Sequence, residues 1–511
     1  MKPNIADEDS GVAPPVMEDR EAEGQVRMAT AMQRLHHGHL IYVPGVGWHF
    51  WDTQRWRIDE LERSTQYVLQ VFKRGLVSAG KKLAKAEKLA DTDPVESERS
   101  RKFAERLISD IRKCQSAMGI RGIKEIARSG PQFARTPQQL DSDPYLINLQ
   151  NGTLNLKSGQ FREHDPADLI TKVGNASFDL DTFDVFNEDT ASLYYPKWFS
   201  FLEQVLPDAQ VRGFVQELMG LALVGTQLEH IMPIFFGNGR NGKGVFTEVM
   251  QHVLGDYAVP AARDLFTSAP GAHSTSQTDL MGARLVFINE TEEGAKLSEA
   301  LVKDATGGGI HTARRMRRDN IRFRRSWLPV MVTNHFPKVS GRGAAIWDRL
   351  LVIEFPVYFD ANSRVTGLED DLKKEADGIF MWAYAGLERY RRAGNKLQVP
   401  KAVTAATQHQ RTLNDKVELW IAERCERGAG KDYRLKSRDL LAAYNSWAAE
   451  PADGGDRYDT RARAMGIQDF LQTLRDKDFK YIHNKAMVEG LRVLGKGELA
   501  ARARTESAPD Q

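Results

Sequence analysis

A glycine-rich segment at residues 237–244 constrains the fold of this chain more than any other feature. It reads Gly237-Asn238-Gly239-Arg240-Asn241-Gly242-Lys243-Gly244, with an apolar run before it and helix-forming residues from Val245 onward. Gly, four residues, then Gly-Lys is the spacing of a phosphate-binding loop, whose glycines let backbone N–H groups face an anion. The segment predicts that residues 237–245 bind a nucleotide. An ordinary glycine-rich turn is the alternative.

Two residues on the metal-binding side depart from the usual pattern of such loops. Gly244 stands where a Ser or Thr hydroxyl usually binds Mg²⁺, and Asn289 stands where many such enzymes carry an Asp. Glu290 follows an apolar run, so we expect it to polarise the attacking water and to contact the metal. Glu292 and Glu293 are further candidates, or simply surface acids.

The overall composition narrows the class of protein. The chain has 511 residues, a net charge of +2 and two cysteines, Cys114 and Cys425. This length predicts about three domains. Two distant cysteines suggest a reducing compartment, and no stretch has the ~18 consecutive apolar residues of a membrane span. Because the net charge is near zero, a nucleic-acid surface must be a local patch.

The chain before the phosphate loop is predicted to contain a tail, an α+β domain and a helical collar. The acidic residues 1–28 lack an apolar period and are predicted to be disordered. The α+β domain is predicted over residues 29–185 and the collar over 186–228. Within the domain we expect an aromatic β-hairpin, helices and a second hairpin at Asn151-Gly152, over residues 40–51, 58–128 and 143–180.

Four apolar runs predict the sheet that carries the phosphate loop. They lie at residues 231–236, 285–288, 330–333 and 350–355. Continuous apolar runs are typical of strands buried on both faces of a parallel sheet. Residues 229–395 are therefore predicted to form an α/β P-loop nucleoside-triphosphatase core.

Two further side chains border these runs. Asn334 ends the third run, where it would orient the water or sense the γ-phosphate, although a strand-terminal Asn is often only a turn former. Arg349 precedes the fourth run and is a candidate arginine finger for the nucleotide of a neighbouring subunit. A salt bridge with Asp348 or Glu354 is the alternative for Arg349.

An arginine-dense segment between Thr312 and Arg325 is predicted to form a hairpin with its turn at Arg318-Asp319-Asn320. So many arginines with one acid repel one another unless an anion is near. The residues predicted to contact DNA phosphates are Arg314, Arg315, Arg317, Arg318 and Arg322. A solvated charged loop is the alternative.

Residues 400–495 are predicted to form a winged-helix domain, followed by a tail at 496–511. The pattern indicates helices over residues 405–428, 435–449 and 463–477, and then strands at 480–482 and 490–494 that would pair as a wing. Three helices and a wing are typical of DNA binding, with protein contacts as the alternative.

Several motifs occur in one order along the chain, and that order is more specific than any single motif. They are Tyr42-Val43-Pro44 with Trp48, Trp51-Asp52 and Trp56; Asn151 to Leu156 with Ser158-Gly159 and His164-Asp165-Pro166; Gly237 to Gly244; Glu290 to Gly294; Lys303 with Thr306-Gly307-Gly308; Thr312-Ala313-Arg314; Thr333-Asn334-His335; and Ile346-Trp347 with Arg349. On these motifs the chain, from about Leu40 to Leu494, resembles the phage and plasmid primase-helicases of poxvirus type, whose ATPase belongs to helicase superfamily 3.

The resemblance implies an AAA+-like core in a homohexameric ring that hydrolyses ATP with Mg²⁺. Such a ring translocates on single-stranded DNA and unwinds duplex DNA in phage, prophage or plasmid replication, in the cytoplasm of a bacterial host. It also implies roles for Lys243 as the phosphate-loop lysine, Glu290 as the catalytic acid, Asn334 as the strand-end sensor, Arg349 as the finger, and the hairpin around Arg317 and Arg318 as the channel loop. Fewer than about 40 residues precede the matching part, so we expect no primase domain and a possible separate primase or loader.

Two other functions fit part of the pattern. The missing hydroxyl and Asp on the metal side fit a replication initiator or regulator that binds nucleotide and DNA but hydrolyses little. A DNA-packaging motor also fits the ATPase core. The C-terminal wing and the lack of a nuclease carboxylate cluster argue against a packaging motor.

Overall fold

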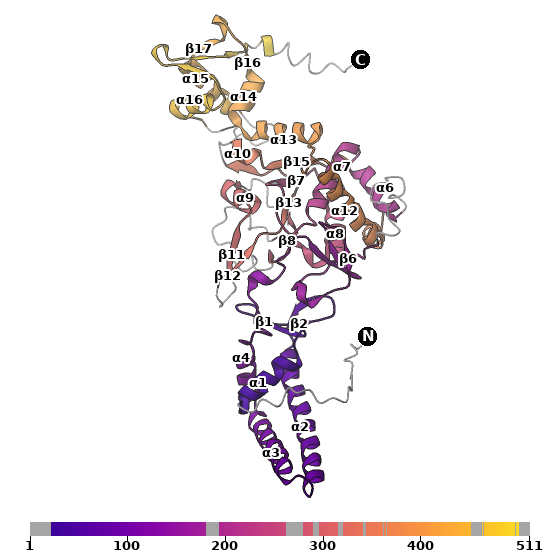
Figure 1. Ribbon diagram of the computed structural model, residues 1–511. Coiled ribbons are helices and arrows are strands. Elements are labelled where there is room, and N and C mark those ends of the chain that lie inside the picture. The colour runs from indigo at the N-terminus through magenta and orange to yellow at the C-terminus, as the bar shows by residue number, and fades with distance from the viewer. Residues whose placement is uncertain are drawn as a thin grey trace.

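The computed structural model has three parts that follow one another along its long direction (Figure 1). The N-terminal helices lie at one end, an α/β core occupies the middle, and a small C-terminal domain lies at the other end. The structure describes residues 22–179, 194–261, 280–289, 296–314, 320–340, 344–360, 362–363, 365–450, 462, 464–495 and 497–499. Within these ranges no helix has the length and hydropathy needed to cross a membrane.

A helical bundle with its own apolar core forms the N-terminal end. Its helices are α1 (Gly24–Leu35), α2 (Arg63–Leu89), α3 (Pro94–Cys114) and α4 (Ala117–Ala127). α2 and α3 form a long hairpin (Figure 1), and the Asp93 carboxylate caps α3 by accepting from the Glu96 amide at 3.0 Å. The predicted aromatic hairpin is confirmed as an antiparallel sheet of β1 (Leu40–Val43), β2 (Gly47–Trp51) and β3 (Trp56–Ile58).

The predicted tail of residues 1–28 is wrong at its C-terminal end, because α1 begins at Gly24. Met28 and Met32 are fully buried, and Arg27 forms an ion pair of 2.9 Å with Asp110 of α3. The apolar positions of α1 are mainly methionines and alanines among polar residues, and this composition conceals the helical period. Residues 1–21 lie outside the described part.

A second antiparallel sheet packs against the middle of the molecule. Its strands are β4 (Leu146–Leu149), β5 (Gly152–Asn155) and β6 (Phe161–Arg162), with the predicted turn between β4 and β5. Its apolar side chains share a core with the α/β part and not with the helical bundle. The buried Arg284 guanidinium donates to the carbonyls of Leu146 and Leu223. The predicted α+β domain of residues 29–185 therefore packs as two separate parts.

A five-stranded parallel sheet forms the centre of the middle part. Its order is β15-β7-β13-β9-β8, and its strands are β7 (Met232–Phe236), β8 (Ala258–Ala261), β9 (Leu285–Asn289), β13 (Leu328–Thr333) and β15 (Leu350–Glu354). Ile234 and Phe235 belong to different apolar cores, so both faces of the sheet are covered. The four predicted strands are confirmed, and the short β8 is an addition.

Helices cover both faces of this sheet. On one face lie α6 (Pro196–Val205), α7 (Ala209–Leu221), α8 (Lys243–Leu254), α11 (Leu368–Lys373) and α12 (Ala376–Arg392), and on the other lie α9 (Glu299–Thr306) and α10 (Ala344–Trp347). α6 and α7 lie within the helical collar predicted over residues 186–228, whose bounds stay a prediction. α7 and α12 cross in close contact at Gly386, which has no Cβ. A Cβ at this position would lie only 2.0 Å from the Gln216 carbonyl oxygen of α7.

The two edges of the sheet are closed in different ways. Pro260 in the edge strand β8 has no N–H to offer to a further strand. At the other edge the Val352 amide of β15 donates to Thr407 Oγ1 at 2.9 Å. Thr407 belongs to α13 (Lys401–Asn414), which runs along β15 and leads into the C-terminal domain (Figure 1).

The C-terminal domain contains three helices and two small sheets. Its elements are α14 (Lys416–Arg424), β16 (Cys425–Arg427), β17 (Arg434–Lys436), α15 (Ser437–Ala448), α16 (Ile467–Arg475), β18 (Lys480–Ile482), β19 (Met487–Glu489) and β20 (Leu491–Val493). The predicted pairing of residues 480–482 with 490–494 is wrong. β18 pairs with β19, whereas β20 pairs with β16. Gly490, with φ of +109°, turns the chain between β19 and β20 and separates the two pairings.

Candidate nucleotide-binding site

The predicted phosphate loop lies between the carboxyl end of β7 and the start of α8. Gly239, Arg240 and Gly242 have left-handed φ angles of +84°, +48° and +86°. A Cβ at Gly242 would lie 2.4 Å from Val205 Cγ1 at the end of α6. Backbone conformation and packing therefore both require glycine at position 242.

The Lys243 side chain connects the loop to the neighbouring strand. Only 4% of Lys243 is exposed. Its Nζ donates to the Gly237 carbonyl at 2.7 Å and to the Oδ1 atoms of Asn241 and Asn334 at 3.1 Å each. Asn334 follows β13, the strand next to β7. The structure thus brings together two of the predicted catalytic residues, Lys243 and Asn334, through a direct hydrogen bond.

The first turn of α8 leaves room beside the loop. A Cβ at Gly244 would meet no atom of the described residues within 4 Å, and Gly244 has no left-handed φ angle. The N-terminus of α8 also points its partial positive charge toward the loop. Backbone N–H groups at a helix N-terminus together with an ammonium are groups that can bind a phosphate. Among the described residues, position 244 has space for a side chain.

The segment after β15 contacts the loop from the other side. Asn241 Nδ2 donates to the Phe355 carbonyl at 3.3 Å, and the Phe359 amide donates to the Arg240 carbonyl at 2.8 Å. Arg240 Nη1 donates to the exposed Tyr358 hydroxyl at 3.2 Å. Sequence reasoning missed this segment, since it has no glycine pattern and no charge cluster.

The metal-binding half of the prediction falls largely outside the described residues. Asn289 ends β9 and is exposed, but Glu290, Glu292 and Glu293 belong to the range 290–295, which the structure does not describe. Among the described residues there is no group of three or more His, Cys, Asp or Glu side chains that could hold a metal ion. The assignment of Glu290 to Mg²⁺ stays a prediction.

Arg349 lies at the amino ends of the strands, whereas the phosphate loop lies at their carboxyl ends. It precedes β15, whereas the loop follows β7, and the two strands are parallel. Its Nη1 donates to Thr306 Oγ1 at the end of α9, at 2.7 Å. Arg349 is therefore remote from the phosphate loop of its own chain.

The predicted arginine hairpin is confirmed as the antiparallel pair β11 (Ile310–Arg314) and β12 (Asn320–Arg324). Arg322 and Arg324 are exposed on β12, and Phe323 between them is buried against Trp327. Arg325 differs from its neighbours, because it is buried and donates to the Asp304 carboxylate at 2.5 Å. Of the other predicted DNA contacts, Arg315, Arg317 and Arg318 and the side chain of Arg314 lie outside the described part.

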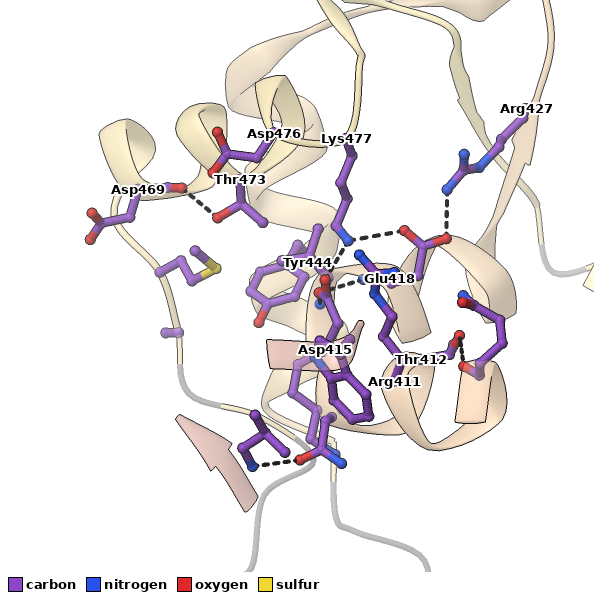
Figure 2. A pocket seen from close by; sticks show the side chains of 18 of the residues that line it. Arg411, Thr412, Asp415, Glu418, Arg427, Tyr444, Asp469, Thr473, Asp476 and Lys477 are labelled. Carbon is purple, nitrogen blue, oxygen red and sulfur yellow. Dashed lines mark hydrogen bonds and ion pairs between the residues drawn. The ribbon is translucent and has the colours of Figure 1, made fainter. Parts of the chain in front are cut away.

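A separate cleft of about 930 Å³ lies between the core and the C-terminal domain (Figure 2). Lys477 on one wall forms ion pairs with Asp415 and with Glu418, the latter at 3.1 Å. Glu418 also accepts from Arg427 at 2.5 Å. Figure 2 shows these groups pointing toward one another. Their charges are paired within the protein, and the cleft contains none of the predicted site residues.

Comparisons with known proteins bear on the resemblance drawn from the motifs. Residues 29–207 match the protein family described as "D5 N terminal like". The "Putative helicase L207/L206" of Acanthamoeba polyphaga mimivirus is 26% identical over 342 residues, which are 62% of this chain and 34% of the viral protein. The "Putative primase C962R" of African swine fever virus is 21% identical over 393 residues, which are 71% and 39% of the two chains. The chain thus spans about a third of the length of these curated relatives.

A solved structure titled "The A form apo structure of NrS-1 C terminal region-CTR" aligns with 73% of this chain and 88% of its own chain, at 13% identity and a TM-score of 0.40. The sequence relatives and the family match confirm the resemblance to the primase-helicase family.

Proposed function

We propose, from the premise that this chain is a relative of viral helicases and primases, that it is an ATP-dependent DNA helicase. In this proposal the chain forms a homohexameric ring that translocates on single-stranded DNA during replication. A separate primase or loader is a possible partner. A phage, prophage or plasmid origin and a bacterial cytoplasm remain predictions.

One observation carries the proposal: a buried lysine in a glycine cradle, hydrogen-bonded to the strand-end Asn334. A buried ammonium is costly unless oxygen atoms surround it. Nucleotide phosphates supply such oxygens with a full opposite charge, so Lys243 would bind the β- and γ-phosphates. Asn334 would then orient the attacking water or the γ-phosphate.

The remaining roles follow from positions in the sheet. Glu290 follows β9, which lies next to β13, the strand that precedes Asn334. From there Glu290 would polarise the attacking water and contact Mg²⁺. Mg²⁺ would neutralise charge that develops on the phosphates. Because Arg349 lies at the amino ends of the strands, away from the phosphate loop of its own chain, it would act on the nucleotide of an adjacent subunit.

The DNA contacts are assigned by charge. The exposed Arg322 and the arginines around the β11–β12 turn would bind the phosphate backbone in the channel. The C-terminal domain, with three helices and a small sheet, would act as a winged-helix DNA-binding or protein-binding domain.

Steady-state ATP hydrolysis with and without single-stranded DNA, at fixed Mg²⁺ concentration, tests the proposal. We expect stimulation by DNA, loss of turnover in Lys243→Ala, and unchanged turnover in Lys374→Ala, a matched control at an exposed lysine after α11. Undiminished turnover in Lys243→Ala would refute the assignment of the site.

A second candidate function is supported by Gly244 and Asn289. An initiator or regulator that binds ATP and DNA but hydrolyses little would need less complete metal coordination. Tight ATP binding with negligible turnover, unchanged by DNA, would favour this second function over a translocating motor.

A further inference from the structure

The hairpin of α2 and α3 concentrates positive charge in this chain. Residues 63–114 contain 13 Lys and Arg against 7 Asp and Glu, a net charge of +6, whereas the whole chain has +2. Such an asymmetry of charge indicates an anionic partner. We propose that one face of α2, formed by Lys73, Lys81 and Lys88, binds the phosphate backbone of duplex DNA outside the proposed channel. These three residues are called the lysine stripe below.

The lysine stripe lies on the solvent side of α2. Its members are 8 and 7 residues apart, which places them within about 80° of one another around the helix axis. All three are exposed. The apolar face of α2, with Val68, Val71 and Phe72, packs into the core of the helical bundle. The packing of the bundle therefore leaves the stripe open to a partner.

Several other cations of the hairpin are paired with carboxylates of the same hairpin. Lys85 forms an ion pair of 3.2 Å with Glu96, and Arg101 and Lys102 form ion pairs of 2.6 and 3.2 Å with Glu98. Within the part of the chain that the structure describes, the lysine stripe has no such ion pair. Its three ammonium groups can therefore bind an external anion without breaking an internal contact.

The spacing of the stripe and the packing of the aromatic residues favour duplex DNA over a single strand. The helical rise places Lys73 and Lys81 about 12 Å apart along α2. The major groove of B-DNA, bordered by a row of phosphates on each side, is also about 12 Å wide. Proteins that hold single strands usually add aromatic side chains on which bases stack, but Tyr67, Phe72 and Phe103 of the hairpin are not exposed. The expected contact is with phosphates and does not read the base sequence.

An anionic membrane surface is the competing partner for a basic helix. Leu76 and Val77, beside the stripe, are 43% and 55% exposed. A helix at a membrane surface buries its apolar face in the lipid, whereas the apolar face of α2 is already covered by the bundle. The structure therefore favours DNA.

The position of the hairpin relates this contact to the rest of the molecule. The hairpin projects at the end opposite the C-terminal domain (Figure 1). Gln138, which follows the bundle in the chain, donates to the Arg322 carbonyl of β12 at 3.1 Å. A duplex on the stripe would thus approach the core on the side of the β11–β12 hairpin, while a single strand lies in the channel. This last step rests on the proposed function, whereas the duplex contact does not.

Fluorescence anisotropy of the full chain with a labelled duplex, without ATP and over a series of salt concentrations, tests the contact. The test variant carries Lys73→Gln, Lys81→Gln and Lys88→Gln, and glutamine is a good helix former. Each lost phosphate contact lowers the slope of log affinity against log salt by about 0.9, so we expect a fall of about 3 and at least about tenfold weaker binding at low salt. The control variant has the same net charge and replaces three exposed lysines outside the hairpin by Gln: Lys374, Lys396 and Lys401.

The outcomes separate the proposal from its competitors. Equal slopes in the two triple variants would overturn it. A lower slope for a single strand of the same length, with the duplex slope unchanged, would overturn the choice of duplex DNA. Lost binding to phosphatidylserine vesicles with intact duplex binding would assign the stripe to a membrane instead. Equal helix content by circular dichroism shows that a changed slope reports charge and not unfolding. Because no ATP is present, failure of the proposed ATPase would leave this result unchanged.

Discussion

Replacing Gly242 by alanine should damage the phosphate loop far more than the same change two residues later. The φ angle of +86° at Gly242 is left-handed, which costs an alanine about 1–2 kcal/mol. The new Cβ would also lie 2.4 Å from Val205 Cγ1. Val205 is fully buried, and forcing extra volume into a packed core costs about 1–3 kcal/mol. Together these terms predict a loss of about 2–5 kcal/mol in the free energy of unfolding of the core.

Urea denaturation monitored by tryptophan fluorescence measures this loss, and Gly244→Ala is the matched control. At Gly244 a Cβ meets no atom of the described residues and the φ angle is not left-handed, so alanine should be neutral or stabilise by about 0.4–1 kcal/mol. In a Val205→Ala background, Gly242→Ala should lose the clash with Val205 Cγ1 and keep mainly the cost of the backbone conformation. Equal effects of the two glycine substitutions, or no relief in the Val205→Ala background, would refute the reasoning.

Four further perturbations test other parts of the molecule. Gly244→Ser restores a hydroxyl where there is room for it, so ATP turnover at limiting Mg²⁺ should rise; a decrease would contradict the proposed metal position. Arg349→Ala should lower turnover by about 10³-fold while ATP still binds. Mixing Arg349→Ala subunits with Lys243→Ala subunits should restore part of the activity, because an intact Arg349 of one subunit would meet an intact phosphate loop of the other. A finger acting within its own subunit would give no such rescue. Arg322→Ala should reduce the slope of log affinity for DNA against log salt by about 1, and an unchanged slope would remove Arg322 from the DNA contact. Burial lowers the pKa of His36 to about 4. The stability this gives is complete above about pH 6.5 and is lost by up to about 3 kcal/mol as pH falls toward 4, so His36→Phe should flatten the dependence of unfolding on pH over that range.

The central sheet was predictable because its signal is local. Strands buried on both faces need continuous apolar runs, and the runs at β7, β9, β13 and β15 stand out against the polar segments between them. β8 gives no such signal, since four residues that include Pro260 look like a loop. In the same way, the polar composition of α1 conceals the buried Met28.

The candidate site was predictable in its residues but not in its contacts. The spacing of the loop identifies Lys243, whereas its bond to Asn334 depends on β13 being adjacent to β7, and strand order is not encoded in the spacing of the runs. A small cavity lined by Leu206, Glu354 and Ala406 depends on even more distant pairs, because these residues come together only through packing. The pairing of β20 with β16 is likewise set by tertiary contacts and not by a hairpin turn.

The two edges of the central sheet disfavour one way in which copies of this chain could associate. An open edge strand is a template for adding strands from another molecule, which leads to swapped or fibrous aggregates. Pro260 withholds a donor at one edge, and Thr407 of α13 accepts the Val352 amide at the other. Backbone pairing between sheets is therefore disfavoured at both edges. Subunits of the proposed ring would then join through side-chain surfaces and could shift against one another without tearing a shared sheet.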